Sequence, residues 1–218
     1  MTVPSVAICF SGLPRLSAQK AINSWLKIVK QYKANVFVHT WLENENDRDW
    51  IEDRIIPIFK PKMFKYEPFR NFDVSSFTER HWPTVNPYRM MSGFTSVNES
   101  IALATSFKKY DFIVRARFDV EIDELLLSNT EGVTVHDDKD KHILKFNYRN
   151  REYFGINDLV AYGSDEMMRL YARTNQNMYD LYHYECVDVC PEIFLTSNLI
   201  KEGVDINFQN IPHRIVRG

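Results

Sequence analysis

The start of the chain alternates between continuous apolar runs and a stretch with one apolar face. Residues 3–10 contain the unbroken run Val6-Ala-Ile-Cys-Phe10, which is typical of a central strand in a parallel sheet. Residues 17–32 place apolar side chains at helical spacing, and residues 35–41 form a second apolar run that ends in polar groups. Strand, turn, helix and strand in this order predict a βαβ unit.

More regular structure is predicted further along the chain. Residues 43–54 are charged and predicted to be helical, whereas residues 69–88 predict an irregular excursion, which in a compact domain is often functional. A long helix is predicted over residues 88–109, leading into a strand at 110–123. Further predicted elements are a strand at 143–148, helices from Ser164 and over 191–202, and terminal strands at 204–208 and 214–216. Residues 1–218 are therefore predicted to form a single α/β domain, with a mixed, mostly parallel central sheet flanked by helices.

Charged residues alternate along the second half of the predicted strand at 110–123. They are Arg115, Arg117, Asp119, Glu121 and Asp123. Alternate residues of a strand point to one face, so the pattern predicts two cations and three carboxylates side by side. Carboxylates suit Mg or Mn, and arginines grip phosphate in a forked geometry, so a metal with a diphosphate would pair with this group. The same alternation also fits an ion-pair ladder on an edge strand facing solvent.

Composition narrows the class of protein. The 218 residues are 44% apolar, and a formal net charge of −2 gives no overall basic field, so no nucleic-acid partner is expected. Cys9, Cys186 and Cys190 show neither a disulfide framework nor zinc-site spacing, which favours a reduced, cytoplasmic protein. We see no secretory signal and no apolar stretch of about 18 residues, so any membrane contact is expected to be peripheral.

Polar residues follow both of the first two predicted strands. The turn Ser11-Gly12-Leu-Pro-Arg15 follows the first strand, and His39 and Trp41 end the second. Strand ends of one sheet converge on one crevice, where open α/β sheets bind nucleotides, and an aromatic ring there can stack on a base. The turn contains neither a P-loop nor a dinucleotide fingerprint. It also fits a tight turn with a surface arginine, and His39 and Trp41 also fit core positions.

Motif order across most of the chain resembles a known class of enzymes. The motifs are Ser11-Gly12 with Arg15, Val36-Phe-Val-His-Thr-Trp41, the run from Tyr110 to Asp119, Ile156-Asn-Asp158 before Tyr162-Gly-Ser164, and Pro191-Glu192. In this order they resemble small glycosyltransferase-like proteins of bacterial polysaccharide loci and viruses, of the GT-A type. The resemblance implies a nucleotide-sugar-binding half over residues 1–123 and an acceptor-side half over 124–218.

The resemblance also implies a donor site. GT-A enzymes hold Mn or Mg against the donor diphosphate with an Asp-x-Asp motif, and Asp119-Val-Glu121 occupies that place, with Glu in place of the second Asp. Some of these enzymes use a late histidine as a further metal ligand, which makes His213 a candidate, although it also fits a surface position. Arg115 and Arg117, together with Arg15 in the first turn, are candidates for donor contacts.

Two acidic residues are candidates for the general base that an inverting transfer requires. Asp158 follows Asn157 at a loop–strand junction, and Glu192 follows Pro191 at the start of a predicted helix. An acid in a first helical turn also interacts favourably with the helix dipole, which is the alternative explanation of Glu192. A retaining reaction would need no such base.

The expected activity is glycosyl transfer from a nucleoside diphosphate sugar to a glycan or lipid-linked acceptor. Two alternatives stay open on the sequence. One is a non-catalytic nucleotide- or carbohydrate-binding module of the same fold, and the other is a metal-dependent phosphoesterase with a two-metal centre.

Overall fold

A seven-stranded sheet forms the centre of the described part of the chain, with strand order β3-β2-β1-β4-β7-β6-β8. The computed structural model describes residues 3–13, 19–77, 85–128, 131–137 and 155–216. The strands are β1 (Val6–Gly12), β2 (Asn35–Leu42), β3 (Met63–Pro68), β4 (Phe112–Arg117), β6 (Val133–His136), β7 (Ala161–Gly163) and β8 (Ile206–Gln209). β5 (Val120–Ile122) and β9 (His213–Ile215) form a separate antiparallel ribbon.

The sheet is mixed and mostly parallel, as predicted. β3, β2, β1 and β4 are parallel neighbours, as are β6 and β8, whereas β7 runs antiparallel to both β4 and β6. The helices are α1 (Gln19–Tyr32), α2 (Glu45–Trp50), the π-helical turn η1 (Ile51–Ile55), α3 (Ile56–Phe59), α4 (Pro87–Phe107), α5 (Asp165–Ala172), α6 (Thr174–His183) and α7 (Pro191–Lys201). The predicted βαβ opening and the long helix are confirmed within a few residues at each end.

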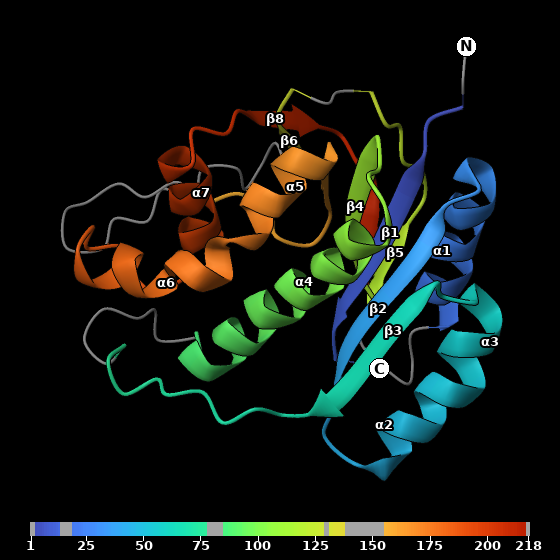
Figure 1. The fold of residues 1–218 in the computed structure, drawn as a ribbon, viewed down its shortest axis with the longest axis horizontal. Helices are drawn as coiled ribbons and strands as arrows, with labels where there is room; N and C mark the ends of the chain where they lie inside the picture. The colour runs from blue at the N-terminus through green and yellow to red at the C-terminus, as the bar shows by residue number, and fades with distance from the viewer. Residues whose placement is uncertain (1–2, 14–18, 78–84, 129–130, 138–154, 217–218) are drawn as a thin grey trace.

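Strand β1 shows why the sheet is covered on both faces. Ala7 and Cys9 lie in one apolar core with α4, α5, α6 and α7, whereas Ile8 and Phe10 lie in a second core with α1, η1 and α3. Successive strand residues point to opposite faces, so a continuous apolar run is buried on both. Figure 1 shows α4 lying across one face of the parallel strands, with α1 on the other side.

The connections reverse direction between β1 and β4. From β1 the chain passes through α1 to β2 on one side, and from β3 it passes through α4 to β4 on the other. The two strands pair in parallel, with Ser11 beside Arg117. In open α/β sheets such a reversal leaves a crevice at the carboxyl ends of the strands.

The predicted strand at 110–123 is wrong in its second half, because β4 ends at Arg117 and the chain turns at Phe118 and Asp119. The Phe118 ring is buried and stacks on Phe10, with ring centroids 5.2 Å apart. Beyond the turn, β5 packs on α1, where the Trp25 indole N–H donates to the carbonyl of Val120 at 2.8 Å. The five alternating charges therefore do not share one sheet face.

Of the other predicted elements, some are confirmed and some lie outside the described residues. The terminal strands correspond to β8 and β9, and helices begin after Ser164 and Cys190 as expected. Residues 69–77 contain no helix or strand. The predicted strand at 143–148 and Arg15 lie outside the described residues.

Candidate functional site

A pocket opens where β1, β2 and β4 end and α4 begins. It has a volume of about 390 Å³, and ligand sites commonly span about 300–1,000 Å³. Its polar lining includes Ser11, Asn86, Arg89, Ser92, Arg115, Arg117, Asp119, Asp158 and Tyr171. The pocket therefore lies at the crevice where the connections reverse, and three arginines and two aspartates give its lining one net positive charge.

Arg115 is the most unusual residue of this pocket. It is only 6% exposed, yet its Nε and Nη1 atoms have no hydrogen-bond partner among the described residues. Its Nη2 lies 3.9 Å from a carboxylate oxygen of Asp158, beyond hydrogen-bond distance. A buried cation whose donors lack acceptors is costly, because it loses hydration without compensation. The arrangement fits a site that is completed by an anion.

Ser11 presents a second unsatisfied group to the same pocket. Its buried Oγ has no hydrogen-bond partner among the described residues. The next residue, Gly12, has φ +101, a conformation that favours glycine, and its N–H donates to Ser96 Oγ at 2.7 Å. The glycine therefore lets β1 end in a bend, which α4 holds in place through Ser96.

Arg117 and Asp119 form a forked ion pair across the turn that ends β4. Arg117 Nε donates to Asp119 Oδ1 at 2.8 Å, and Nη2 donates to Oδ2 at 2.7 Å. Burial lowers the pKa of Arg117, but the hydrogen bond to Asp119 and the charges of Asp158 and Asp119 raise it further, so the net shift is upward. Both oxygens of Asp119 thus accept hydrogen bonds from a permanent cation.

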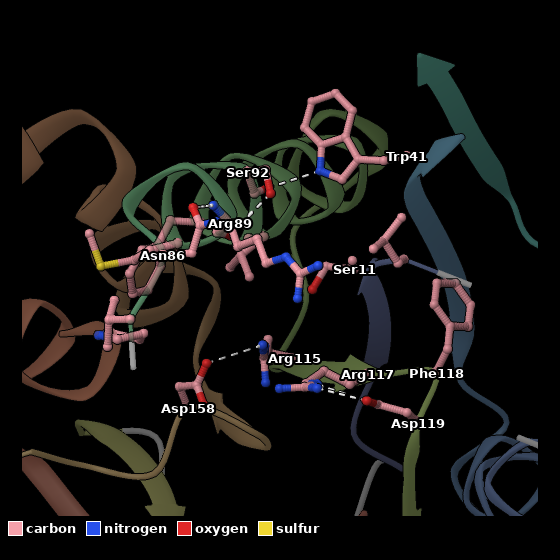
Figure 2. Close-up of a pocket in the computed structure, with 18 of the residues that line it drawn as sticks. Ser11, Trp41, Asn86, Arg89, Ser92, Arg115, Arg117, Phe118, Asp119 and Asp158 are labelled. Atoms are coloured by element: carbon pink, nitrogen blue, oxygen red, sulfur yellow. Dashed lines mark hydrogen bonds and ion pairs between the residues drawn. The ribbon is translucent and has the colours of Figure 1, made fainter. Parts of the chain in front are cut away.

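Arg89 belongs to the pocket but is not apparent from the sequence. Figure 2 shows its side chain reaching from α4 toward Ser11, with Arg115 and Arg117 on the opposite wall. Asn86 caps α4 by accepting from the N–H groups of Tyr88 and Arg89. The one available signal was a cation in the first turn of a long helix, where a cation opposes the helix dipole and an anion is favoured.

Asp158 and Glu192 lie close together, but only Asp158 lines the pocket. Burial, and then the charge of Asp158, raises the pKa of Glu192, and the Cys190 thiol donates to its Oε2 at 2.9 Å. Burial likewise raises the pKa of the pocket residue Tyr171 to about 12. The two predicted catalytic acids are therefore neighbours with different surroundings, and of the two only Asp158 lines the pocket.

Trp41 lines the pocket but is 1% exposed. Its indole N–H donates to the carbonyl of Ser92 at 3.0 Å, and Phe69 stacks on its ring at 5.5 Å between centroids. In this arrangement its ring has no open face for a base. The core position that the sequence left open for Trp41 therefore describes it better.

His39 is fully buried and does not line the pocket. Its Nδ1 lies 2.9 Å from Ser96 Oγ, and its Nε2 lies 3.1 Å from Glu67 Oε1. Ser96 also accepts from Gly12, so His39 supports the pocket through the end of β1. This too matches the core alternative rather than direct ligand contact.

The buried His39 predicts a loss of stability in mild acid. Burial lowers its pKa below the ordinary 6.5, outweighing the hydrogen bond to Glu67 and the charges of Glu67 and Glu99, while Lys65 lowers it further. Below about pH 6.5 the His39 imidazole binds a proton in the unfolded chain, whereas in the folded protein it stays neutral to a lower pH. The free energy of unfolding therefore falls as pH falls. Urea unfolding between about pH 7 and pH 5 measures this slope. The slope should be shallower in His39→Gln, and an equal slope in both proteins would contradict the prediction.

Glu121 and His213 lie on the β5–β9 ribbon and do not line the pocket. Glu121 pairs with Arg214, which lowers its pKa, and the His213 ring packs edge-on against His136 at 4.4 Å between centroids. Among the described residues, no group of three or more His, Cys, Asp or Glu side chains is placed to hold a metal ion. The structure therefore does not unite Asp119, Glu121 and His213 as one ligand set.

No protein-family model matches this chain, and no curated protein does either. Within the described helices, none is both long and apolar enough to cross a membrane.

Proposed function

We propose that this protein transfers a glycosyl group from a nucleoside diphosphate sugar to a hydroxyl of a glycan or lipid-linked acceptor. The observation that carries the proposal is the buried, incompletely paired guanidinium of Arg115 at the crevice between β1 and β4. Nucleotides bind at this position in open α/β sheets, and a diphosphate is the part of the donor that requires cations. The motif order that resembles GT-A enzymes supports the same reading.

The proposed reaction gives two arginines of the pocket and Asp158 different tasks: the two arginines act on the diphosphate, and Asp158 lies on the acceptor side. The acceptor oxygen attacks the anomeric carbon of the donor, the bond from that carbon to the diphosphate oxygen breaks, and the bonding electrons leave with the diphosphate. Arg115 and Arg89 stabilise the charge that grows on this leaving group, because both guanidiniums line the pocket and carry their charge before the reaction.

Asp158 is the proposed general base, which takes the acceptor proton as the new bond forms. It lines the pocket, whereas Glu192 does not and has a pKa raised by burial. This raised pKa makes Glu192 the weaker candidate for a base, because a base has to accept a proton from its ionised form. This assignment makes the proposed reaction an inverting one.

Mn or Mg, implied by the resemblance, stays a prediction. The fit is poor among the described residues: Asp119 is held by Arg117, while Glu121 and His213 lie outside the pocket. A bound cation would supply charge neutralisation to the leaving diphosphate, and no step above depends on it.

A donor screen tests the proposal. The protein is incubated with uridine and guanosine diphosphate sugars, with EDTA or with Mn, and release of nucleoside diphosphate is followed. We expect slow hydrolysis of one donor, reduced about 100-fold or more in Arg115→Met. The control is Arg54→Met, which changes an exposed arginine of η1 and should hydrolyse that donor as the parent does.

The outcomes of this screen separate the functional classes. Nucleotide binding without release would favour a non-catalytic module over a transferase. Phosphate release from simple esters would favour a phosphoesterase. If no donor is bound and none releases its nucleoside diphosphate, the proposal is overturned.

A further inference from the structure

The pocket pairs the carboxylate of Asp119 but leaves N–H donors of Arg115 and the hydroxyl of Ser11 unpaired. Asp119 accepts two hydrogen bonds from Arg117, and Asp158 is the only other acid in the described lining. By contrast, Arg115 Nε and Nη1 and the Ser11 hydroxyl have no partner among the described residues. These buried donors therefore lack hydrogen-bond acceptors, which an anion supplies and a cation does not.

A divalent cation would have to compete with an arginine for Asp119. The forked pair uses both carboxylate oxygens at 2.7 and 2.8 Å, and charge-assisted forks of this kind are strong. Mg and Mn also require several oxygen ligands, and among the described residues no group of three or more acidic, His or Cys side chains is placed to hold a metal ion.

We propose that the pocket binds the diphosphate group of its ligand through Arg115, Arg89 and Ser11, without a divalent cation. The identity of the ligand rests on the proposed function, whereas the binding mode rests on the pocket alone. Arg115 supplies its unpaired Nε–H and Nη1–H donors, Arg89 supplies a second guanidinium from α4, and the Ser11 hydroxyl donates from the end of β1. The guanidiniums then do what a metal does in metal-dependent transferases: they neutralise the phosphoryl oxygens.

Arg117 has a positioning role in this scheme. Its fork to Asp119 keeps that carboxylate away from the phosphate oxygens, which it would otherwise repel, and fixes the turn at Phe118. The remaining acid, Asp158, is partly exposed and lies 3.9 Å from Arg115, at the side of the pocket assigned to the acceptor.

Titration calorimetry with inorganic pyrophosphate, and with uridine and guanosine diphosphates, tests the inference in EDTA and again with Mn or Mg. We expect pyrophosphate to bind in EDTA, with little gain from either metal. Arg115→Met should weaken pyrophosphate binding about 10- to 150-fold, which corresponds to the free energy of hydrogen bonds to a charged group. Arg89→Met should weaken it by a smaller factor, about 1.4- to 5-fold, since Arg89 is exposed. Arg54→Met serves as the matched control and should bind as the parent does.

The folded state of each variant is checked by thermal unfolding with and without pyrophosphate. The parent should be stabilised by pyrophosphate in EDTA, and a folded Arg115→Met should lose that stabilisation. Should Arg115→Met not fold, Arg89→Met and Arg115→Lys carry the test, because Lys keeps the charge but loses the fork.

Binding that appears only with Mn or Mg would overturn the inference, and so would no pyrophosphate binding at all or equal binding by the folded Arg variants. Failure of the proposed function looks different. In that case pyrophosphate binds in EDTA and depends on Arg115, but no nucleotide sugar is turned over.

Discussion

Asp158→Asn should slow glycosyl transfer about 100- to 10,000-fold, the range of a lost general base. Diphosphate binding should be unchanged or tighter, because the substitution removes a negative charge 3.9 Å from Arg115. A slower transfer without weaker binding separates a base from a donor-binding residue, whose loss would weaken binding. Single-turnover rates of transfer and calorimetric titration with the nucleoside diphosphate measure them separately.

Two variants and one product analysis control this prediction. Glu192→Gln should reduce transfer much less, because Glu192 does not line the pocket. Asp180→Asn changes an exposed acid of α6 and should be neutral. The anomeric configuration of the product should be inverted. A retained configuration, or a variant that loses donor affinity at an unchanged rate, would contradict the role of Asp158.

The sequence predicted those elements in which the local pattern of apolar residues agrees with the tertiary structure. Unbroken apolar runs define β1 and β2 because both faces of these strands are covered by helices. Ser11, Arg115 and Arg117 could each be singled out from the sequence, but their meeting at one crevice depends on β1 and β4 being parallel neighbours, which the structure shows. The approximate place of the pocket follows from that register.

Contacts between distant segments determine the course of the chain after Arg117 and the roles of His39 and Trp41. Alternating charge continues past Arg117, but the burial of Phe118 turns the chain, and Glu121 is carried away to Arg214. His39 and Trp41 end a strand beside the crevice, yet Glu67, Ser96 and Phe69 occupy their polar groups and ring faces. No local pattern contains these partners, because they come from distant segments.

Arg89 shows a different limit of sequence reasoning. It lies in a helix whose pattern is dominated by apolar residues that pack on the sheet, so one cation in its first turn was too small a signal to point to a pocket by itself. Its place in the pocket depends on how α4 crosses the strand ends, which is a property of the assembled layers (Figures 1 and 2).

Phe118→Ala should lower the free energy of unfolding by about 3–5 kcal/mol, the usual cost of truncating a buried Phe. The ring is 1% exposed, stacks on Phe10 and meets Trp50 edge-on at 6.2 Å between centroids, so a cavity would open beneath the turn between β4 and β5. Urea unfolding measures the change. Phe64→Ala, which truncates a 47% exposed ring on β3, should cost about 0.5 kcal/mol or less.

The same substitution should also weaken pyrophosphate binding in EDTA, because Phe118 sets the turn that joins Arg117 to Asp119. With the ring removed, the turn gains freedom, the fork between the two side chains breaks more often, and the released carboxylate of Asp119 repels the anion. Phe118→Leu, which keeps most of the buried volume, should restore much of both the stability and the binding. A loss of stability in Phe118→Ala without any loss of binding would show that the pocket does not depend on this turn.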